Sequence, residues 1–464
     1  MKILLVVYDN DAFLHQFPLG TAYIAAALRK AGHDVTIYQQ DVYHMPEDHL
    51  TAHLDGNNYD MVGVGVIGGY YQYRKLLKIS DSINRSRKRP LYVIGGHGPS
   101  PEPAYFLKKT GADAVVIGEG ENTIVELCRA IESKSPWEDV KGIAYMDNKR
   151  GKFQTNGERA LIKDLDLITH PAWELFDINY YALFRYPNIR HNQRGLPMIT
   201  GRGCPYRCNF CYRMDKGFRP RRPQSIIDEI KILKERYGIT YITFSDELLM
   251  SSEARTIELC DQFLKANLGI NWYCNGRLNY ASGKVLKLMK RAGCVFINYG
   301  IEAMDDLALE KMEKQLTTAQ IIRGVENTLE AGISPGLNII FGNLGESRET
   351  LMKGVEFLLK YDDMAQIRTI RPVTPYPGSP LYYYAIEKGL LKDCADFYEH
   401  KHRNSDLLSV NFTDMTDNEF HASLFEANKM LLENYFKKKF AASVEQFEKM
   451  YCHNDTSFRG LRHT

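Results

Sequence analysis

The sequence predicts an α/β fold in two successive units, each built from short strands that alternate with helices. Apolar runs rich in Val and Ile recur along residues 1–133 and again along 196–385, as expected for parallel strands buried on both faces. Stretches with apolar residues at helical spacing separate these runs. Alternation of strand and helix in this order is typical of parallel sheets.

The first unit, residues 1–137, has five expected strands. They are placed at 2–8, 34–38, 60–66, 91–94 and 112–117, with helices at 19–31, 71–85, 102–110 and 121–133. This order indicates a flavodoxin-like (Rossmann-type) doubly wound domain, in which a ligand sits outside the carboxyl ends of the strands. Glycines gather at those ends and allow close backbone approach to a ligand, at 68–69, 95–98 and 118–120.

Residues 138–195 are expected to form a hairpin and an interdomain linker. Strand 142–146 and a turn at 147–151 predict the hairpin. The irregular stretch 177–194 is rich in aromatic residues and is expected to pack between the two units.

The second unit, residues 196–385, contains six expected strands. They are placed at 198–200, 241–244, 272–274, 296–299, 336–341 and 367–372, with helices at 224–237, 252–266, 283–292, 317–331 and 349–361. Six strands with helices between them fit a partial (βα)6 TIM-like barrel, whose functional groups should lie at the carboxyl ends of the strands. The last part, 386–464, is a polar C-terminal helical region with apolar residues at helical spacing across 417–440, and it is expected to close the barrel.

Composition indicates an ordinary globular protein. Of 464 residues, 44% are hydrophobic and 25% charged, and the net charge of +2 gives no reason to expect nucleic acid or a membrane surface as a partner. No apolar run approaches the roughly 20 residues that span a bilayer. Six of the nine cysteines are scattered without the spacing of a disulfide scaffold, which fits a reducing cytoplasm.

The loop 203–212 carries Cys204, Cys208 and Cys211, at i, i+4 and i+7. A closed structural zinc site needs four ligands, and the nearest histidine, His191, lies well upstream, so the pattern is a poor zinc site. It suits a 4Fe–4S cluster held through three irons, with the fourth open to a small molecule. With Phe210 just before the third cysteine, the motif resembles that of the radical S-adenosylmethionine (SAM) superfamily.

This resemblance implies that the open iron binds the amino and carboxylate groups of SAM. Reductive cleavage of SAM would then give a 5′-deoxyadenosyl radical, which removes a hydrogen atom from a substrate. The three cysteines become the metal ligands, Phe210 packs on the adenine, and the electron comes from a donor such as flavodoxin or ferredoxin. Chance spacing of cysteines, or a redox-labile loop, is the competing interpretation.

The first unit resembles the cobalamin-binding domain that precedes the catalytic domain in one branch of this superfamily. The matching segments are 17–20, 95–100, 111–113 and 118–121, together with 164–173, which resembles the interdomain linker of that branch. The Asp-x-His-x-x-Gly motif of enzymes that bind cobalt through histidine is absent, because His15 has the wrong spacing from Asp11 and Gly20. His15 and His97 are therefore expected to be polar loop residues, and the sequence does not decide whether cobalamin is bound.

The other expected cofactor contacts come from strand ends. Either Asp246 or Glu247 should receive the methionyl ammonium of SAM, and the sequence does not choose between them. The fork of donors on Arg277 suits a carboxylate. Glu302 stands in a segment that resembles the ribose contact of the family, and Asn338 follows on the next strand.

Further residues are assigned more loosely. Arg371 stands on the sixth strand, before segment 374–380, which resembles a recurrent mark of the cobalamin-associated branch. Tyr273 and Tyr299 are tentative proton or hydrogen donors, and the catalytic residues are otherwise unknown. Cys274 and Cys294 are expected to be small core residues, because free cysteine is among the most buried residue types.

These features favour a radical SAM enzyme, a methyltransferase that performs cobalamin-dependent C-methylation of a small-molecule or natural-product precursor. The alternative reaction is a cobalamin-independent dehydration, cyclisation or rearrangement by a lyase or cyclase. A non-catalytic iron–sulfur protein is the alternative of another class, and the polar residues at successive strand ends argue against it. No membrane partner is expected, and a nucleic-acid substrate is disfavoured by the near-neutral charge.

Overall fold

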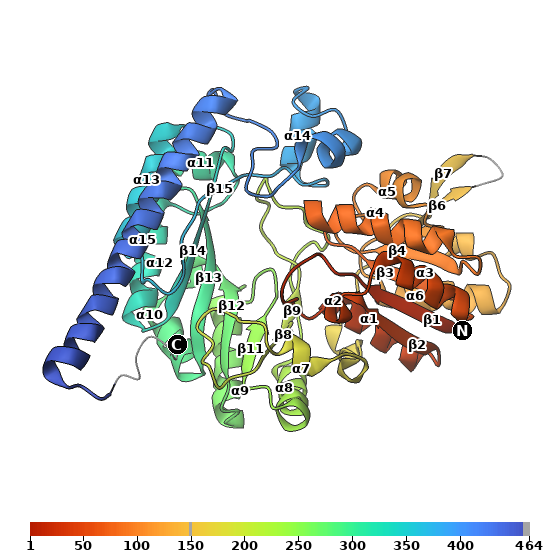
Figure 1. The fold of residues 1–464 in the computed structure, drawn as a ribbon, viewed down its shortest axis with the longest axis horizontal. Coiled ribbons are helices and arrows are strands. Elements are labelled where there is room, and N and C mark those ends of the chain that lie inside the picture. Colours follow the sequence, from red (N-terminus) through yellow and green to blue (C-terminus); the bar gives the residue numbers. More distant parts are fainter. Residues whose placement is uncertain (148–150, 458–464) are drawn as a thin grey trace.

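Two sheets of mainly parallel strands organise the chain (Figure 1). The computed structural model describes residues 1–147 and 151–457. The first sheet has the strand order β2-β1-β3-β4-β5-β6-β7, and the second has the order β15-β14-β13-β12-β11-β8. The predicted α/β class, with a doubly wound sheet followed by a six-stranded partial barrel, is confirmed.

The first sheet is a doubly wound sheet with an antiparallel extension. Its parallel strands are β1 (Lys2–Val7), β2 (Asp34–Gln39), β3 (Met61–Gly65), β4 (Leu91–Gly95) and β5 (Ala114–Val116). The helices are α1 (Leu19–Lys30), α2 (Gln40–Tyr43), α3 (Glu47–Gly56), α4 (Tyr70–Arg85), α5 (Pro103–Thr110) and α6 (Glu121–Glu132). The order 2-1-3-4-5 is that of flavodoxin and places the topological switch point between β1 and β3.

The predicted hairpin belongs to this first sheet. Strand β6 (Ile143–Asp147) pairs antiparallel with β5, and β7 (Lys152–Thr155) pairs antiparallel with β6. The predicted turn lies mainly at 148–150, outside the described residues. The sequence missed α3 because the helix buries only Leu50 and Leu54, too few for a clear period.

The second sheet is the predicted partial barrel. Its strands are β8 (Gly195–Met198), β11 (Tyr241–Phe244), β12 (Asn271–Gly276), β13 (Cys294–Glu302), β14 (Ser334–Phe341) and β15 (Arg371–Pro372). The helices are α8 (Pro223–Tyr237), α9 (Glu253–Ala266), α10 (Gly283–Arg291), α11 (Asp306–Lys311), α12 (Thr318–Glu330) and α13 (Arg348–Tyr361). All the strand pairs are parallel, so the carboxyl ends meet at one edge.

Two of the predicted strands were misplaced, each for a local reason. Strand β8 ends at Met198, because the N–H of Thr200 donates to the Asp246 carboxylate instead of to a neighbouring strand. Strand β15 is only two residues long, because the N–H of Ile370 donates to the side chain of Asn428.

The C-terminal part of the chain serves both units. Segment 373–412, with α14 (Pro380–Glu387), packs against α4 and α5 of the first unit (Figure 1). The Tyr398 ring lies 4.6 Å from that of Tyr73 and 5.5 Å from that of Phe106. The expectation that everything after residue 385 closes the barrel is therefore wrong for 386–412.

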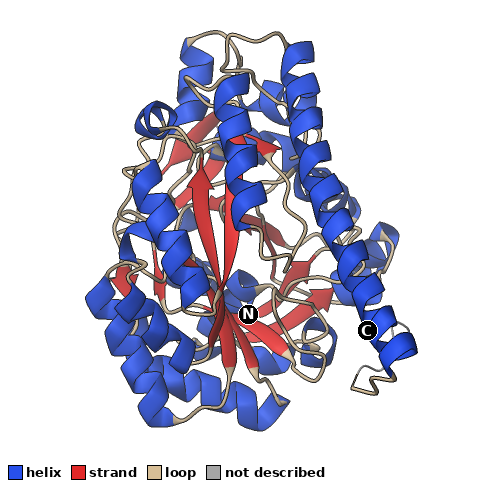
Figure 2. Cartoon of the chain, turned by 90° about the vertical axis from the view of Figure 1, so that its left-hand side faces the viewer, coloured by secondary structure: helices blue, strands red, loops and turns tan. Residues whose placement is uncertain are grey.

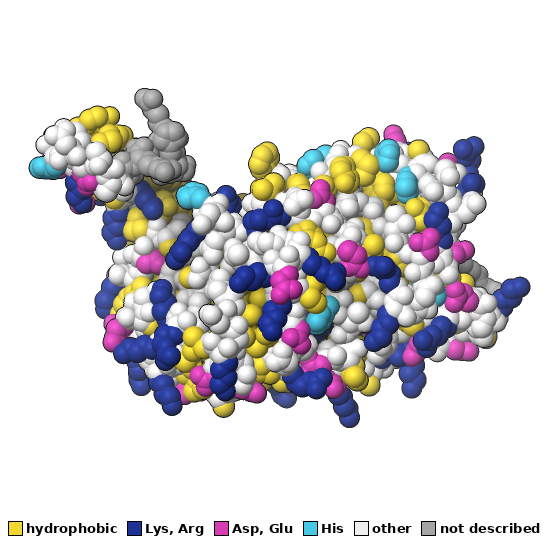
Figure 3. Space-filling model, turned by 90° about the horizontal axis from the view of Figure 1, so that it is seen from below, with side chains coloured by type: hydrophobic (Ala, Val, Ile, Leu, Met, Phe, Trp, Pro, Cys, Tyr) yellow, Lys and Arg dark blue, Asp and Glu magenta, His cyan; other side chains and the backbone are white. Residues whose placement is uncertain are grey.

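Helix α15 (Asp417–His453) does cover the barrel, as Figure 2 shows beside the other helices. Phe420 packs on Phe341 of β14 with ring centroids 4.8 Å apart. Among the described residues no helix has the length and apolar character needed to cross a bilayer. Basic and acidic side chains are interspersed over the face that Figure 3 shows.

Candidate active site

The three-cysteine loop lies at the carboxyl edge of the barrel, between the strands of a short ribbon. Strands β9 (Gly201–Arg202) and β10 (Arg219–Pro220) pair antiparallel at its base. Gly203 has a φ of +84°, and a Cβ there would collide with the carbonyl oxygen of Gly217. Only glycine fits this turn, which directs the chain into Cys204.

Asn209 anchors the middle of the loop. Its N–H donates to the carbonyl of Met312 at 3.0 Å, and its side-chain amide donates to the Asn343 side chain at 3.1 Å. The N–H of Leu381 donates to the carbonyl of Asn209 at 2.8 Å. Sequence reasoning missed Asn209 and Asn343, although each stands beside residues that it singled out.

The three thiols share one electrostatic environment. Burial raises the pKa of Cys204, and the neighbouring Cys208 raises it further. Desolvation likewise raises the pKa of Cys211, with added effects from Cys208 and Glu302. Thiols that repel each other's charge are stabilised as thiolates by a metal centre.

Three thiols at i, i+4 and i+7 suit a cluster better than a closed zinc site, which needs four ligands. Within residues 1–147 and 151–457, no three His, Cys, Asp or Glu side chains are close enough to hold one metal ion. With cysteine as the natural ligand of iron–sulfur clusters, Cys204, Cys208 and Cys211 fit the group that the sequence predicts.

The two candidate acids after β11 have different environments. Asp246 is 1% exposed, and its carboxylate accepts the N–H groups of Thr200, at 2.8 Å, and of Gly201. Burial raises the pKa of Asp246 to about 7. Glu247 is exposed and accepts the N–H of Gly203 at 3.0 Å. Asp246 therefore joins the ends of β8 and β11, whereas Glu247 is the open carboxylate beside the cysteine loop.

Arg277 supports the loop with its guanidinium group. This group lies 3.5 Å from the centroid of the Tyr206 ring. It also donates to the carbonyls of Lys314 and, at 3.1 Å, of Gln315. Arg277 is buried, and both of these bonds come from its Nη2, while its Nε has no hydrogen-bond partner among the described residues. Its predicted contact with a carboxylate stays a prediction.

Glu302 ends β13 in a left-handed conformation, with a φ of +69°. Its carboxylate lies 2.8 Å from the Lys314 ammonium in a buried ion pair. The same ammonium lies 5.8 Å from the centroid of the Phe210 ring. Strained backbone of this kind persists where surrounding contacts hold it and is frequent at functional sites. Glu302, Lys314 and Phe210 thus converge beside Cys211.

Three asparagines form a ladder across the barrel sheet. The amide of Asn338 donates to the side chain of Asn298 at 2.7 Å, and Asn298 donates to the side chain of Asn275 at 3.1 Å. Asn275 in turn donates to the carbonyl of Asp246 at 2.7 Å. Asn338 is exposed at the open end of the ladder. The predicted residue Asn338 therefore belongs to a row of amides that continues across three strands.

Neither tentative tyrosine is near the cysteine loop. Tyr273 lies among aromatic residues toward the amino ends of the strands, 6.1 Å from Tyr186 and 5.8 Å from Phe296 between ring centroids. Tyr299 is fully buried, and its hydroxyl is 3.0 Å from that of Thr328 on α12. Tyr299 points outward because it alternates with Asn298, and its role as a hydrogen donor stays a prediction.

Arg371 stands on the short strand β15, in register with Ile340 near the carboxyl end of β14, and its predicted cofactor contact stays a prediction. Arg371 forms an exposed ion pair with Asp406, at 2.9 Å, on segment 373–412. Cys274 and Cys294 are fully buried, which confirms that they are core residues.

The carboxyl edge of the first sheet presents open, apolar loops. Phe13, after β1, is 93% exposed, and Ile67 and Tyr71, after β3, are also exposed. A Cβ at Gly118 would meet nothing within 4 Å. A large, partly apolar ligand fits such an edge, because exposed apolar side chains mark binding surfaces. The residues present therefore fit a cobalamin-sized group.

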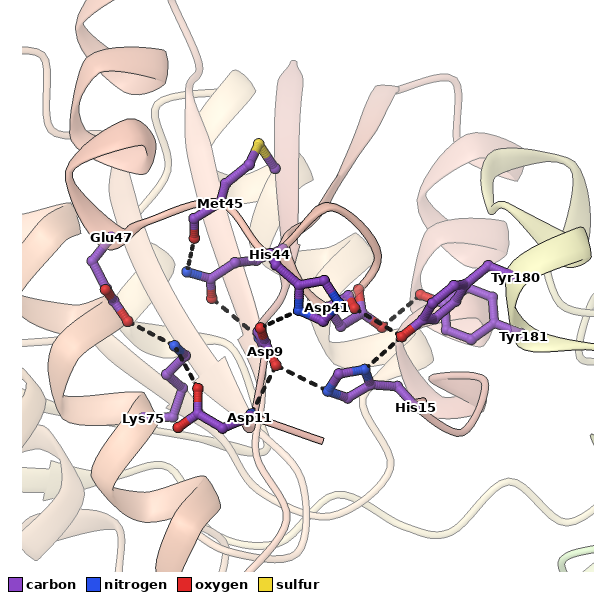
Figure 4. Close-up of polar contacts among 11 residues, drawn as sticks. Asp9, Asp11, His15, Asp41, His44, Met45, Glu47, Lys75, Tyr180 and Tyr181 are labelled. Carbon is purple, nitrogen blue, oxygen red and sulfur yellow. Dashed lines mark hydrogen bonds and ion pairs between the residues drawn. The ribbon is translucent and has the colours of Figure 1, made fainter. Parts of the chain in front are cut away.

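His15 is engaged on both ring nitrogens (Figure 4). Its Nδ1 is 2.8 Å from the Tyr180 hydroxyl, and its Nε2 is 3.1 Å from the Asp9 carboxylate. Burial lowers the pKa of His15. His15 is thus a buried polar residue of the loop after β1, between Tyr180 and Asp9.

The network around His15 also joins the two units. Tyr180 and Tyr181 come from α7 (Ile178–Tyr181) in the aromatic stretch, and the Tyr181 hydroxyl donates to the Asp41 carboxylate at 2.7 Å (Figure 4). Across the gap, the His97 ring after β4 lies 6.2 Å from that of Tyr212, which follows the third cysteine. The carboxyl edges of the two sheets therefore face each other.

Comparison with known proteins agrees with this arrangement. Residues 198–358 match the radical SAM superfamily model, and residues 6–128 match the B12 binding domain model. An uncharacterized methyltransferase of Pyrococcus horikoshii is 31% identical, over 84% of this chain and 84% of that protein. An anaerobic magnesium-protoporphyrin IX monomethyl ester cyclase of Rubrivivax gelatinosus is 28% identical, over 79% of this chain and 65% of that protein.

Solved structures share the fold. The radical SAM methyltransferase TsrM from Kitasatospora setae, solved with cobalamin and a 4Fe–4S cluster, superposes with a TM-score of 0.68 at 20% identity. That match covers 84% of this chain and 78% of TsrM. The cobalamin-dependent SAM radical enzyme OxsB, solved with aqua-cobalamin and SAM, gives a TM-score of 0.65 at 19% identity, over 93% of this chain and 56% of OxsB.

Proposed function

Because the chain belongs to the radical SAM superfamily, in the branch that carries an N-terminal B12-binding domain, we propose that it catalyses cobalamin-dependent methylation of a carbon atom in a small molecule. The observation that carries this proposal is the opposition of two sheet edges. The cysteine loop stands at the carboxyl edge of the barrel, and the open loops of the first sheet face it, with His97 and Tyr212 in ring contact. A substrate between these edges would lie within reach of ligands bound at both.

The residues of the chain would divide the work as follows. Cys204, Cys208 and Cys211 hold the cluster. Glu247, the exposed acid beside Gly203, receives the SAM ammonium through a charge-assisted hydrogen bond. When bound, the cluster supplies the electron that cleaves SAM, and cobalamin supplies the methyl group.

Other side chains orient the ligands and exclude water. The Lys314–Glu302 pair and the Phe210 ring border Cys211, so they limit where the adenosyl part of SAM can lie. The exposed amide of Asn338 offers hydrogen bonds from the opposite side of the barrel mouth. We infer further that the electron comes from a separate donor such as flavodoxin or ferredoxin, in a reducing cytoplasm.

A cyclase-type reaction is the second candidate. It is favoured by the relatives named as anaerobic magnesium-protoporphyrin IX monomethyl ester cyclases, one of them 28% identical over 79% of this chain. The same cysteine loop and acid would serve this reaction, since the radical step is shared. The two candidates differ in the fate of the substrate radical.

Cofactor content tests the proposal. The protein would be purified without oxygen, reconstituted with iron and sulfide, supplied with hydroxocobalamin and desalted before iron, sulfide and absorbance are measured. Cobalamin retained at about one per chain would support methylation, and product analysis would then seek a mass gain of one methylene. A full cluster without retained cobalamin would refute it and turn the search to cyclised or dehydrated products.

A further inference from the structure

Two acidic residues after β5 accept hydrogen bonds from arginines of the barrel unit. They are Glu119 and Glu121, in the glycine-rich segment 118–121 that the sequence places at the carboxyl end of a strand. The Glu119 side chain is only 4% exposed. Its Oε1 accepts from Nη1 of Arg202 at 2.8 Å and from Nη1 of Arg219 at 2.9 Å.

The two arginines stand at the two ends of the cysteine loop. Arg202 lies on β9 and Arg219 on β10, and they are directly paired in the ribbon. All residues from 203 to 218, including the three cysteines, lie between them in the chain. One carboxylate of the first unit therefore bonds both ends of the loop at once.

Further contacts extend this ion-pair group. Arg202 also donates to Glu121 at 2.5 Å, and Arg219 donates to Asp215 at 2.8 Å. The second oxygen of Glu119 accepts the N–H of Ile162, at 2.7 Å, from the segment that links the two units. The group is nearly closed to solvent, so its charges are little screened.

The ion pairs of Glu119 with Arg202 and Arg219 restrict where the cysteine loop can lie. Arginine forks bind carboxylates with defined direction as well as charge. Removing one partner of a buried pair leaves the other charge unpaired, and the structure must then shift or admit water. Loss of the Glu119 charge would leave Arg202 bonded to Glu121 and Arg219 bonded to Asp215. No single carboxylate would then bond both ends of the loop.

We propose that Glu119 is a positioning residue that fixes the cysteine loop against the first unit, and so sets the distance between the cluster and the ligand at the edge of the first sheet. The part that concerns the ligand rests on the proposed function; the part that concerns the loop does not. Glu119 bonds Arg202, Arg219 and Ile162, so it acts on the cysteine loop through the two arginines.

The test compares Glu119→Gln with Asp363→Asn in the full-length, reconstituted protein. Asp363 also accepts from a buried arginine, Arg368, at 2.8 Å, but it lies beside Ser334 at the amino end of β14, away from the loop. Amide hydrogen exchange is measured along the chain in both variants. In Glu119→Gln, exchange within 201–220 should rise about tenfold or more, with little change in the strands of the first sheet.

Electron paramagnetic resonance reports on the distance between the cluster and the cobalt. With hydroxocobalamin bound and reduced to the Co(II) state, the reduced cluster broadens the cobalt signal in electron paramagnetic resonance, to an extent that depends on their separation. Glu119→Gln should alter this broadening while iron content stays at the wild-type level, and Asp363→Asn should not alter it. A protein that retains no cobalamin would contradict the proposed function, and the exchange result would still test the loop.

Two results would overturn the inference. One is unchanged exchange within 201–220 in Glu119→Gln. The other is a uniform rise over the whole first unit, because Glu119 would then be a general stability residue. If Glu119→Gln does not fold, Glu119→Asp keeps the charge but shortens the reach, and it should show the same local rise.

Discussion

Asp41 should make the protein less stable as pH rises toward neutrality. Its side chain is 1% exposed, one oxygen accepts from the Tyr181 hydroxyl, and the other oxygen has no partner among the described residues. Burial raises the pKa of Asp41 from 3.8 to about 7. The folded state therefore binds one proton more than the unfolded state between these values, so the free energy of unfolding falls through this range and levels off above it.

The expected size follows from the width of that window. Between pH 5 and pH 8, the free energy of unfolding falls only from pH 5 to about pH 7, the pKa of folded Asp41. Each unit of this range corresponds to about 1.4 kcal/mol, so the total loss is about 3 kcal/mol. In Asp41→Asn the side chain is neutral at every pH and still accepts from Tyr181. The variant should therefore gain about 3 kcal/mol relative to the wild type between pH 5 and pH 8.

Urea unfolding followed by tryptophan fluorescence measures this difference. Both proteins are unfolded at pH 5 and at pH 8, and Asp48→Asn, at a side chain that is 83% exposed, serves as the control. The control should follow the pH dependence of the wild type. If Asp41→Asn does so too, within about 0.5 kcal/mol, the buried carboxyl does not carry the proton that we assign to it.

Three further outcomes are expected at the barrel. Replacing Cys204, Cys208 and Cys211 together by alanine should abolish both the cluster absorbance and 5′-deoxyadenosine formation, and cleavage that survives would contradict the cluster assignment. Glu247→Gln should weaken SAM binding by roughly tenfold or more, because a hydrogen bond to a charged group is worth about 1.5–3 kcal/mol. Calorimetry measures the affinity, and the iron content should stay unchanged. An unchanged affinity would remove Glu247 from the site. Tyr299→Phe should lower the free energy of unfolding by about 1 kcal/mol through its lost hydroxyl bond and leave the rate of SAM cleavage unchanged, and a slower rate would support Tyr299 as a candidate.

Sequence reasoning succeeded where the periodicity was strong and local. The parallel strands of the first sheet were placed to within about two residues, because each is an apolar run between polar turns. The three-cysteine loop could be found because its spacing alone suggests a ligand set. Alternation along β13 already separates Asn298 from Tyr299 and places their side chains on opposite faces of the sheet.

Other features depend on contacts between residues far apart in the chain. Asp246 and Glu247 are chemically alike, and only the position of Thr200 makes one of them a structural acceptor. Tyr206 and the carbonyls after α11 surround the Arg277 guanidinium. A single sequence contains no signal for these long-range contacts. Some of the site residues could therefore be predicted from the sequence, but their separate roles could not.

The packing of segment 373–412 against the first unit has a consequence for folding during synthesis. Residues 1–132 leave the ribosome first, yet the apolar faces around Tyr73 and Phe106 are covered by Leu381, Phe397 and Tyr398. At the usual pace of synthesis, roughly 5–20 residues per second, that cover arrives on the order of tens of seconds later. During this interval the aromatic surface around Tyr73 and Phe106 lacks the side chains that cover it in the complete fold.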